Sequence, residues 1–207
     1  LDLSPADLAK DTPLLVGIQT LAYLIVVGFM LLIVRLKYNT PFLEAISWNM
    51  PRLGRVLLLL LAGALLAGFS GGASQLLSRW IPKELPIDEF FRTRASAYSM
   101  MFFGIAVAPL AEELFFRGFL YPALARSVGV AASVILTSAS FALLHAGQLA
   151  HAWVPLLIIF IVGSAFTGVR AYTKSVATTV IIHVGYNSTL FTALFIGTQG
   201  FRHLGKP

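Results

Sequence analysis

Residues 97–121 read AYSMMFFGIAVAPLAEELFFRGFLY, an apolar stretch long enough to cross a lipid bilayer as a helix. The stretch also contains two adjacent carboxylates and a guanidinium, Glu112, Glu113 and Arg117. Each such group costs about 2.5 to 3.5 kcal/mol near the bilayer centre on insertion scales, so ionisable residues inside membrane spans are rare and mark functional positions. This stretch therefore predicts a membrane-spanning helix that carries a buried polar site.

The composition extends the membrane prediction to the whole chain. Of its 207 residues, 57% are hydrophobic and 12% are charged, and the mean hydropathy is +0.83. Soluble domains have about 25% charged residues. Stretches of about 20 apolar residues cross a bilayer as helices, so we expect an all-α polytopic membrane protein with about six transmembrane helices. The apolar segments lie at about residues 13–34, 56–77, 97–121, 128–147, 153–169 and 175–197.

Polar residues are distributed unevenly among these segments. The interiors of the first two contain no charged residue and no histidine, whereas the polar clusters described below lie within residues 97–197. We therefore expect the chemistry to belong to residues 97–197. The predicted parts are a two-span region with interfacial loops at 1–95, a four-helix catalytic core at 96–199 and a short tail at 200–207.

The charges and the missing cysteines exclude several classes of function. The net charge is +6, but Lys and Arg are scattered between apolar segments and form no basic helix, which argues against a nucleic-acid partner. Loops that face anionic lipid explain the charge better. With no cysteine in the sequence, disulfides, thiolate nucleophiles and Cys-based metal sites are excluded. We expect a multi-pass protein of the plasma membrane of a prokaryote, whose partners are lipids and a membrane-associated peptide or protein substrate.

Helix geometry separates the two glutamates. Glu113 and Arg117 are four residues apart and share a helix face, with the acid N-terminal to the base, the order that favours an ion pair. Glu112 points about 100° away from Glu113 and about 140° away from Arg117. The pair therefore neutralises itself, and Glu112 needs another partner.

The same four-residue spacing occurs twice more. The stretch FALLH places Phe141 and His145 on one helix face, and HVGYN places His183 and Asn187 on one face. Three separate helices thus carry one unpaired carboxylate, two imidazoles and a carboxamide. We predict that these groups converge on one cavity.

This set of groups fits the hydrolysis of a peptide bond. A buried carboxylate can take a proton from water and return it to a leaving amine, which is the role we assign to Glu112. His145 would hold and polarise the water, while His183 and Asn187 would donate hydrogen bonds to the oxyanion of a tetrahedral intermediate. No serine or cysteine stands in a nucleophile motif such as G-x-S-x-G, so direct attack by water is favoured over an acyl-enzyme.

A zinc mechanism is the alternative for the same residues. Glu112, His145 and His183 supply the two-nitrogen, one-oxygen set that a catalytic zinc accepts. However, the H-E-x-x-H pattern is absent, and the two histidines are 38 residues apart. The cofactor is therefore left open: the preferred mechanism requires none and assigns no metal ligand, and zinc is the alternative.

The three motifs together resemble the E-E-x-x-x-R, F-x-x-x-H and H-x-x-x-N/D signatures of the CPBP family (CAAX proteases and bacteriocin-processing enzymes, also called the Abi family). The resemblance covers about residues 97–197, half of the chain. It implies an α-helical intramembrane endopeptidase whose eukaryotic relatives remove the last three residues of prenylated C-a-a-X proteins, by a mechanism described both as metal-dependent and as metal-free. It also implies catalytic roles for four residues and a supporting role for two: Glu112, His145, His183 and Asn187, with Glu113 and Arg117.

Other interpretations of the same residues stay open. Glu113 and Arg117 would also suit a purely structural ion pair, and buried His or Asn side chains often bond neighbouring helices. A non-enzymatic immunity or scaffold protein that retains the fold is the main functional alternative. A small transporter with Glu112 as a proton relay is a third.

The depths of Glu112 and His145 in the membrane constrain the shape of the third span. At 1.5 Å per residue, Glu112 lies about 15 residues into the segment that starts at residue 97. His145 lies at the end of its own segment, on the side of the membrane from which the segment that carries Glu112 starts. A straight helix would keep them apart. We therefore predict that part of residues 90–101 lies outside the hydrocarbon, or that the helix is tilted or bent near Pro109.

Overall fold

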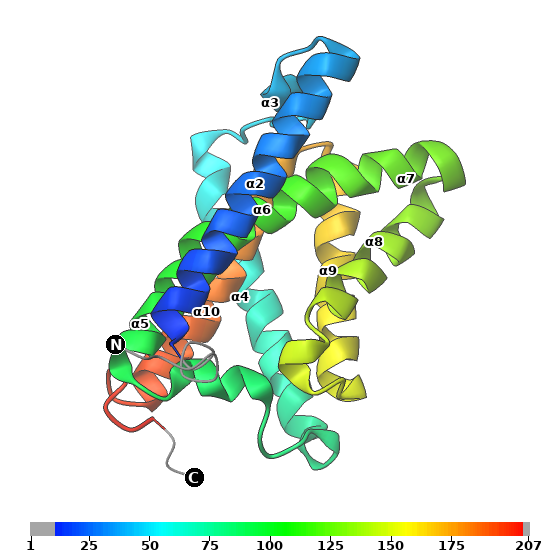
Figure 1. Ribbon diagram of the computed structural model, residues 1–207. Coiled ribbons are helices and arrows are strands. Elements are labelled where there is room, and N and C mark those ends of the chain that lie inside the picture. Colours follow the sequence, from blue (N-terminus) through cyan, green and yellow to red (C-terminus); the bar gives the residue numbers. More distant parts are fainter. Residues whose placement is uncertain (1–10, 205–207) are drawn as a thin grey trace.

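The computed structural model describes residues 11–204, and this part of the chain is helical and contains no strand (Figure 1). Five helical segments are long and apolar enough to cross a membrane, and a sixth apolar helix is shorter. The predicted all-α polytopic membrane fold is confirmed. The segments are α2 (Thr12–Tyr38), α4 (Leu53–Leu76), the run Arg94–Val128, α8 (Val130–Leu144), α9 (Trp153–Thr173) and α10 (Val176–Gly197).

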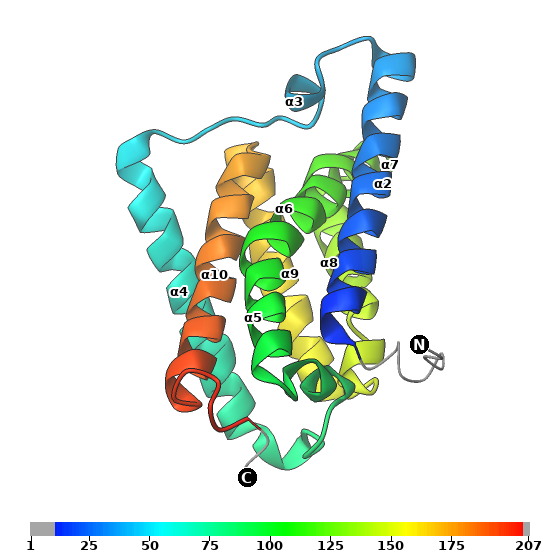
Figure 2. The ribbon, with the colours of Figure 1, turned by 60° about the vertical axis from the view of Figure 1, so that its left-hand side comes forward.

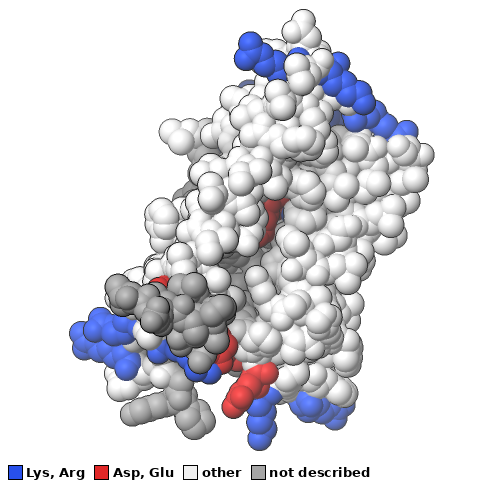
Figure 3. Space-filling view, viewed as in Figure 1, with Lys and Arg blue, Asp and Glu red and all other residues white. Residues whose placement is uncertain are grey.

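Short elements and charged residues lie at the two ends of the bundle. Figure 3 shows Lys and Arg gathered at both ends, with an uncharged belt between them, as expected where helices leave the hydrocarbon for the interfaces. The starts of α2 and α10 are capped: Asp11 accepts a hydrogen bond from the Leu14 amide at 3.1 Å, and Ser175 accepts one from the Thr178 amide at 3.1 Å. The connecting elements are α3 (Phe42–Ala45), η1 (Ser78–Trp80), η2 (Pro86–Phe91) and η5 (Gly147–Leu149).

The third span is bent, as predicted. Figures 1 and 2 show α5 running along the bundle, whereas α7 lies at one end of the bundle and points in a different direction. Two π-helical segments interrupt the run, and Pro109 lies in the first turn of the short α-helix between them. Both features are known causes of helix bending. In chain order the run comprises α5 (Arg94–Phe102), η3 (Phe103–Val107), α6 (Ala108–Glu113), η4 (Leu114–Leu120) and α7 (Tyr121–Val128).

Glycines bring α4 and α10 into backbone contact. A Cβ atom on Gly63 would lie 2.1 Å from the carbonyl oxygen of Ile182, and a Cβ atom on Gly185 would lie 2.4 Å from the carbonyl oxygen of Leu60. Only the missing side chains permit this approach, which is the small-residue packing that membrane helices use. Because α10 also carries His183, the contact with α4 fixes one wall of the polar cavity.

Helix α2 lies on the opposite side of the bundle, beside α5 and α6 (Figure 2). Most of its surface is exposed, and its buried residues within the described chain are Thr12, Met30 and Val34. At the other end of the chain, Phe201 is buried and packs edge-on against Tyr98 with ring centroids 5.1 Å apart. The division of the chain at residues 95 and 199 stays a prediction.

Candidate active site

A cavity of about 580 Å³ lies inside the bundle, with walls from α2, the bent third span, α8, α9 and α10. The four predicted catalytic residues all line it, although they come from three separate helical segments. Figure 3 shows acidic atoms at the bottom of a hollow in the otherwise uncharged belt of the protein. The residues that line the cavity and were predicted to act together are Glu112, His145, His183 and Asn187.

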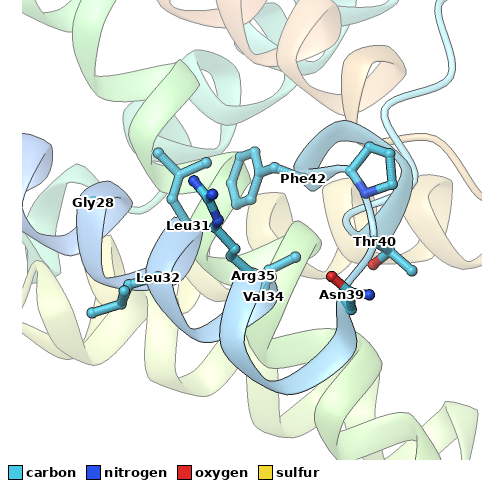
Figure 4. Close-up of a pocket in the computed structure, with 9 residues that line it drawn as sticks. Gly28, Leu31, Leu32, Val34, Arg35, Asn39, Thr40 and Phe42 are labelled. Carbon is cyan, nitrogen blue, oxygen red and sulfur yellow. The ribbon is translucent and has the colours of Figure 1, made fainter.

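A second hollow, of about 600 Å³, lies where α2 ends and α3 begins (Figure 4). Figure 4 shows Arg35, Leu31 and Phe42 around it. Its lining, among the described residues, contains none of the predicted site residues. The candidate active site is therefore the inner cavity.

Glu113 stands at the centre of a buried hydrogen-bond network. Its Oε1 accepts a hydrogen bond from Nη1 of Arg117 at 2.9 Å, across the helix turn that their spacing predicts. The same oxygen lies 3.0 Å from Nδ1 of His183. Since a carboxylate accepts, Nδ1 of His183 is the donor, and this contact turns the other ring nitrogen toward the cavity. Glu113 thus links the EExxxR and HxxxN motifs directly.

Arg117 is fully buried, and its other two nitrogens also donate hydrogen bonds. Its Nε donates to the Thr167 hydroxyl at 3.2 Å, and its Nη2 donates to the Gly163 carbonyl at 3.0 Å. The guanidinium also lies 4.6 Å from the centre of the Phe141 ring, within the range of a cation–π contact. Buried charges need this degree of compensation. Both of these bonding partners lie on α9, which carries none of the motifs found in the sequence.

Glu112 has a different environment from its neighbour. Its side chain is buried, its Oε1 accepts a hydrogen bond from the Tyr23 hydroxyl at 3.0 Å, and its Oε2 lies 3.9 Å from Nε2 of His183. The partner that helix geometry required is therefore Tyr23, which lies on α2. The cavity wall therefore extends beyond residues 97–197, because α2 lines it as well, and the assignment of the chemistry to residues 97–197 stays a prediction.

His145 lies at the C-terminal end of α8. Its Nδ1 is 2.8 Å from the carbonyl oxygen of Phe141, one helical turn earlier. A carbonyl only accepts, so Nδ1 donates, and a neutral ring leaves Nε2 free to accept a proton or a hydrogen bond. Within residues 11–204, His145 makes no direct contact with a carboxylate. The carbonyl orients the imidazole, and the Phe141 side chain packs against the same ring with centroids 4.9 Å apart.

Asn187 is half-buried on α10, one turn after His183. Its Nδ2 donates a hydrogen bond of 2.6 Å to the carbonyl oxygen of Gly104, in the π-helical turn that precedes Glu112. An amide nitrogen carries two hydrogens, so a second N–H is left for another acceptor. This interhelical bond holds the amide at the cavity wall.

One comparison with known proteins gives a match. Residues 94–189 match the family model described as type II CAAX prenyl endopeptidase Rce1-like. Over this segment, the chain is similar to this family of CAAX proteases. The matched segment begins with α5, ends within α10 and includes all six residues singled out in the sequence. No curated protein and no solved structure matches the chain.

This similarity indicates the general chemistry. The Rce1-like family model supports an intramembrane endopeptidase of the CAAX type in general, and the helices long enough to cross a membrane agree with it. Helices α2 and α4 lie outside the matched segment.

A zinc site needs three ligands that point at one position. Among residues 11–204 there is no group of three His, Asp or Glu side chains arranged to hold a metal ion. Glu112 and His183 approach each other at 3.9 Å. Nδ1 of His183 is bonded to Glu113 and Nδ1 of His145 to a carbonyl, which leaves Nε2 of each ring free, as in metal-bound histidines. Zinc stays the alternative for these residues, and the mechanism below uses no step through a metal.

Proposed function

We propose that this protein cleaves a peptide bond by direct attack of a water molecule that Glu112 activates. The observation that carries the proposal is that one buried cavity is lined by a carboxylate without a cationic partner of its own, two imidazoles and an amide. The neighbouring carboxylate already has such a partner, since Glu113 is paired with Arg117. The two glutamates therefore suit different tasks.

The reaction proceeds in two steps. Glu112 takes a proton from water through its Oε2, and the resulting hydroxide attacks the carbonyl carbon of the scissile bond. Nε2 of His145 accepts a hydrogen bond from the water and orients it. When the tetrahedral intermediate collapses, the C–N bond breaks and Glu112 returns its proton to the leaving nitrogen. A carboxylic acid and an amine result, and Glu112 is a carboxylate again.

The oxyanion needs two donors, and this requirement sets the protonation of His183. The free N–H of Asn187 is one donor. His183 is the other donor when its Nε2 carries a proton.

The lining of the cavity indicates the class of substrate. Its walls are mainly apolar and aromatic, and among the described residues no Lys or Arg lines it. We therefore expect a membrane-associated peptide with uncharged residues around the scissile bond, a class that includes CAAX-like and lipidated chains. We further expect the enzyme to act in the plasma membrane of a prokaryote.

The test is cleavage of a peptide panel, with and without lipidation, by the purified full chain in detergent and in proteoliposomes. Glu112→Gln keeps the size of the side chain and the hydrogen bond from Tyr23 but cannot take a proton from water. We expect this variant to express and fold while cleavage is lost. Glu44→Gln, at an exposed position on α3, is the matched control and should cleave as the unchanged chain does.

Three results would contradict the proposal. Cleavage by Glu112→Gln at the unchanged rate would remove the general base. A chain that cleaves no peptide, while its biological effect survives Glu112→Gln, would be a scaffold or immunity protein. Proton movement coupled to a transported solute would identify a transporter.

A further inference from the structure

The structure assigns a positioning role to Tyr23: its hydroxyl holds the Glu112 carboxylate so that one oxygen faces the water. This inference rests on the proposed function of Glu112. It gives α2, which lies outside the matched family segment, a part in the chemistry.

The contact joins two distant parts of the chain. The Tyr23 hydroxyl donates a hydrogen bond of 3.0 Å to Oε1 of Glu112, across 89 positions of sequence. A hydrogen bond to an ionised carboxylate is shorter and about twice as strong as one between neutral groups. A carboxylate oxygen cannot donate while ionised, so the phenol is the donor.

The ring that carries the hydroxyl is held in place. Tyr23 stacks on Phe103 with ring centroids 5.8 Å apart and an angle of 15° between the planes. Phe103 belongs to the same bent span as Glu112. The stack therefore fixes the distance between α2 and the helix that bears the general base.

Glu112 has few other ways to be oriented. The nearest guanidinium, Arg117, is bonded to Glu113, Thr167 and a carbonyl. The contact with His183, at 3.9 Å, is too long to be a hydrogen bond. Bonding of Oε1 by Tyr23 thus sets the direction in which Oε2 points, and Oε2 is the oxygen that takes the proton.

The surroundings of Tyr23 do not suggest a role in core packing. Its neighbours Leu24 and Ile25 are each 64% exposed, and α2 is exposed along most of its length. Tyr23 itself is half-buried and faces the cavity. Removal of the hydroxyl alone should therefore leave the fold intact.

The experiment is Tyr23→Phe, which removes the hydroxyl and keeps the ring that stacks on Phe103. Since misplacement of a catalytic group by about 1 Å can cost on the order of 100-fold, we expect kcat to fall by about 10- to 100-fold with KM unchanged. Tyr38→Phe, at an exposed position at the end of the same helix, is the matched control and should keep the unchanged kcat. In a Glu112→Gln background, Tyr23→Phe should not alter binding of the uncleaved peptide.

The outcomes separate this inference from the proposed function. If the unchanged chain is active, Glu112→Gln is inactive and Tyr23→Phe keeps full kcat, the role of Tyr23 is refuted and the function stands. A Tyr23→Phe variant that raises KM alone, or that lowers the melting temperature, would also refute it and would indicate substrate contact or packing. Activity in Glu112→Gln would refute the function itself.

Discussion

Nδ1 of His183 lies 3.0 Å from Oε1 of Glu113, the same oxygen that accepts a hydrogen bond from Arg117 at 2.9 Å. The second glutamate of the motif therefore does more than neutralise an arginine in the bilayer. Its hydrogen bond fixes the orientation of an imidazole on another helix, as a carboxylate bonded to the free ring nitrogen does for a metal-bound histidine. Glu113 therefore forms a structural ion pair with Arg117 and, through the same oxygen, supports His183 in the candidate active site.

Loss of the Glu113 charge should both destabilise the protein and stop its chemistry. Glu113→Gln leaves the buried guanidinium of Arg117 without its counter-ion, and breaking a buried pair on one side costs about 3 to 5 kcal/mol. The amide can also present N–H to His183 and so release the ring. We expect a lower melting temperature in detergent, followed by circular dichroism, together with loss of cleavage.

The matched control for this variant is an exposed pair. Glu89 bonds Arg92 at the protein surface, with side chains 50% and 65% exposed, and such pairs contribute about 0 to 1 kcal/mol. Glu89→Gln should therefore melt close to the unchanged chain. Equal melting temperatures for the two variants would show that Glu113 is not in a buried pair.

A second prediction concerns the amide on α10. Asn187→Ala removes the proposed oxyanion donor, and loss of one such donor costs about 10²- to 10³-fold in kcat. Asn49→Ala is the matched control, because its Nδ2 donates to the Lys174 carbonyl at 2.9 Å but lies away from the cavity. Kinetic measurement should show a large loss of kcat for Asn187→Ala and little for Asn49→Ala. Equal small losses would mean that Asn187 only ties two helices together.

Much of the fold was predictable because the bilayer imposes it. Because each span needs about 20 apolar residues, segments such as 13–34 can be identified as spans from the sequence alone, without knowledge of tertiary contacts. Boundaries were less predictable: α2 continues to Tyr38, past charged residues, while α8 begins only after Gly129, whose φ is 82°. The pair Glu113–Arg117 was also predictable, because its geometry is internal to one helix.

Contacts between helices were not predictable in the same way. Tyr23 reaches Glu112 across 89 positions, and Asn187 reaches the carbonyl of Gly104 across 83 positions. Both contacts depend on how the helices are rotated and on the π-helical turns of the third span, and a backbone carbonyl leaves no mark in a sequence. A single tyrosine in an apolar segment is a weak signal, since aromatic residues are common in membrane helices.

A third prediction concerns metal dependence. Because no three-ligand group exists among residues 11–204, cleavage should continue at the same rate after exhaustive treatment with a chelator. The measurement is the initial rate on one peptide before chelation, after chelation and after zinc is added back. A rate that falls on chelation and returns with zinc would overturn the metal-free mechanism and would indicate zinc bound through the free Nε2 atoms of His145 and His183.

The contact between α4 and α10 provides a fourth prediction, which tests how α10 is held. An alanine at Gly63 would place its Cβ 2.1 Å from the Ile182 carbonyl oxygen, so Gly63→Ala must push the two helices apart. Overpacking of this kind costs about 1 to 3 kcal/mol, occasionally more. Since α10 carries His183, we expect a lower melting temperature and a kcat reduced on the order of 100-fold.

Gly68→Ala on the same helix is the matched control for that variant. A Cβ there would meet no heavy atom within 4 Å, and alanine favours a helix over glycine by about 0.5 to 1 kcal/mol. This variant should therefore melt at the same temperature as the unchanged chain or slightly higher, with full activity. If Gly63→Ala behaves in the same way, α4 does not press on α10, and the position of His183 must be set by α9 and the bent third span instead.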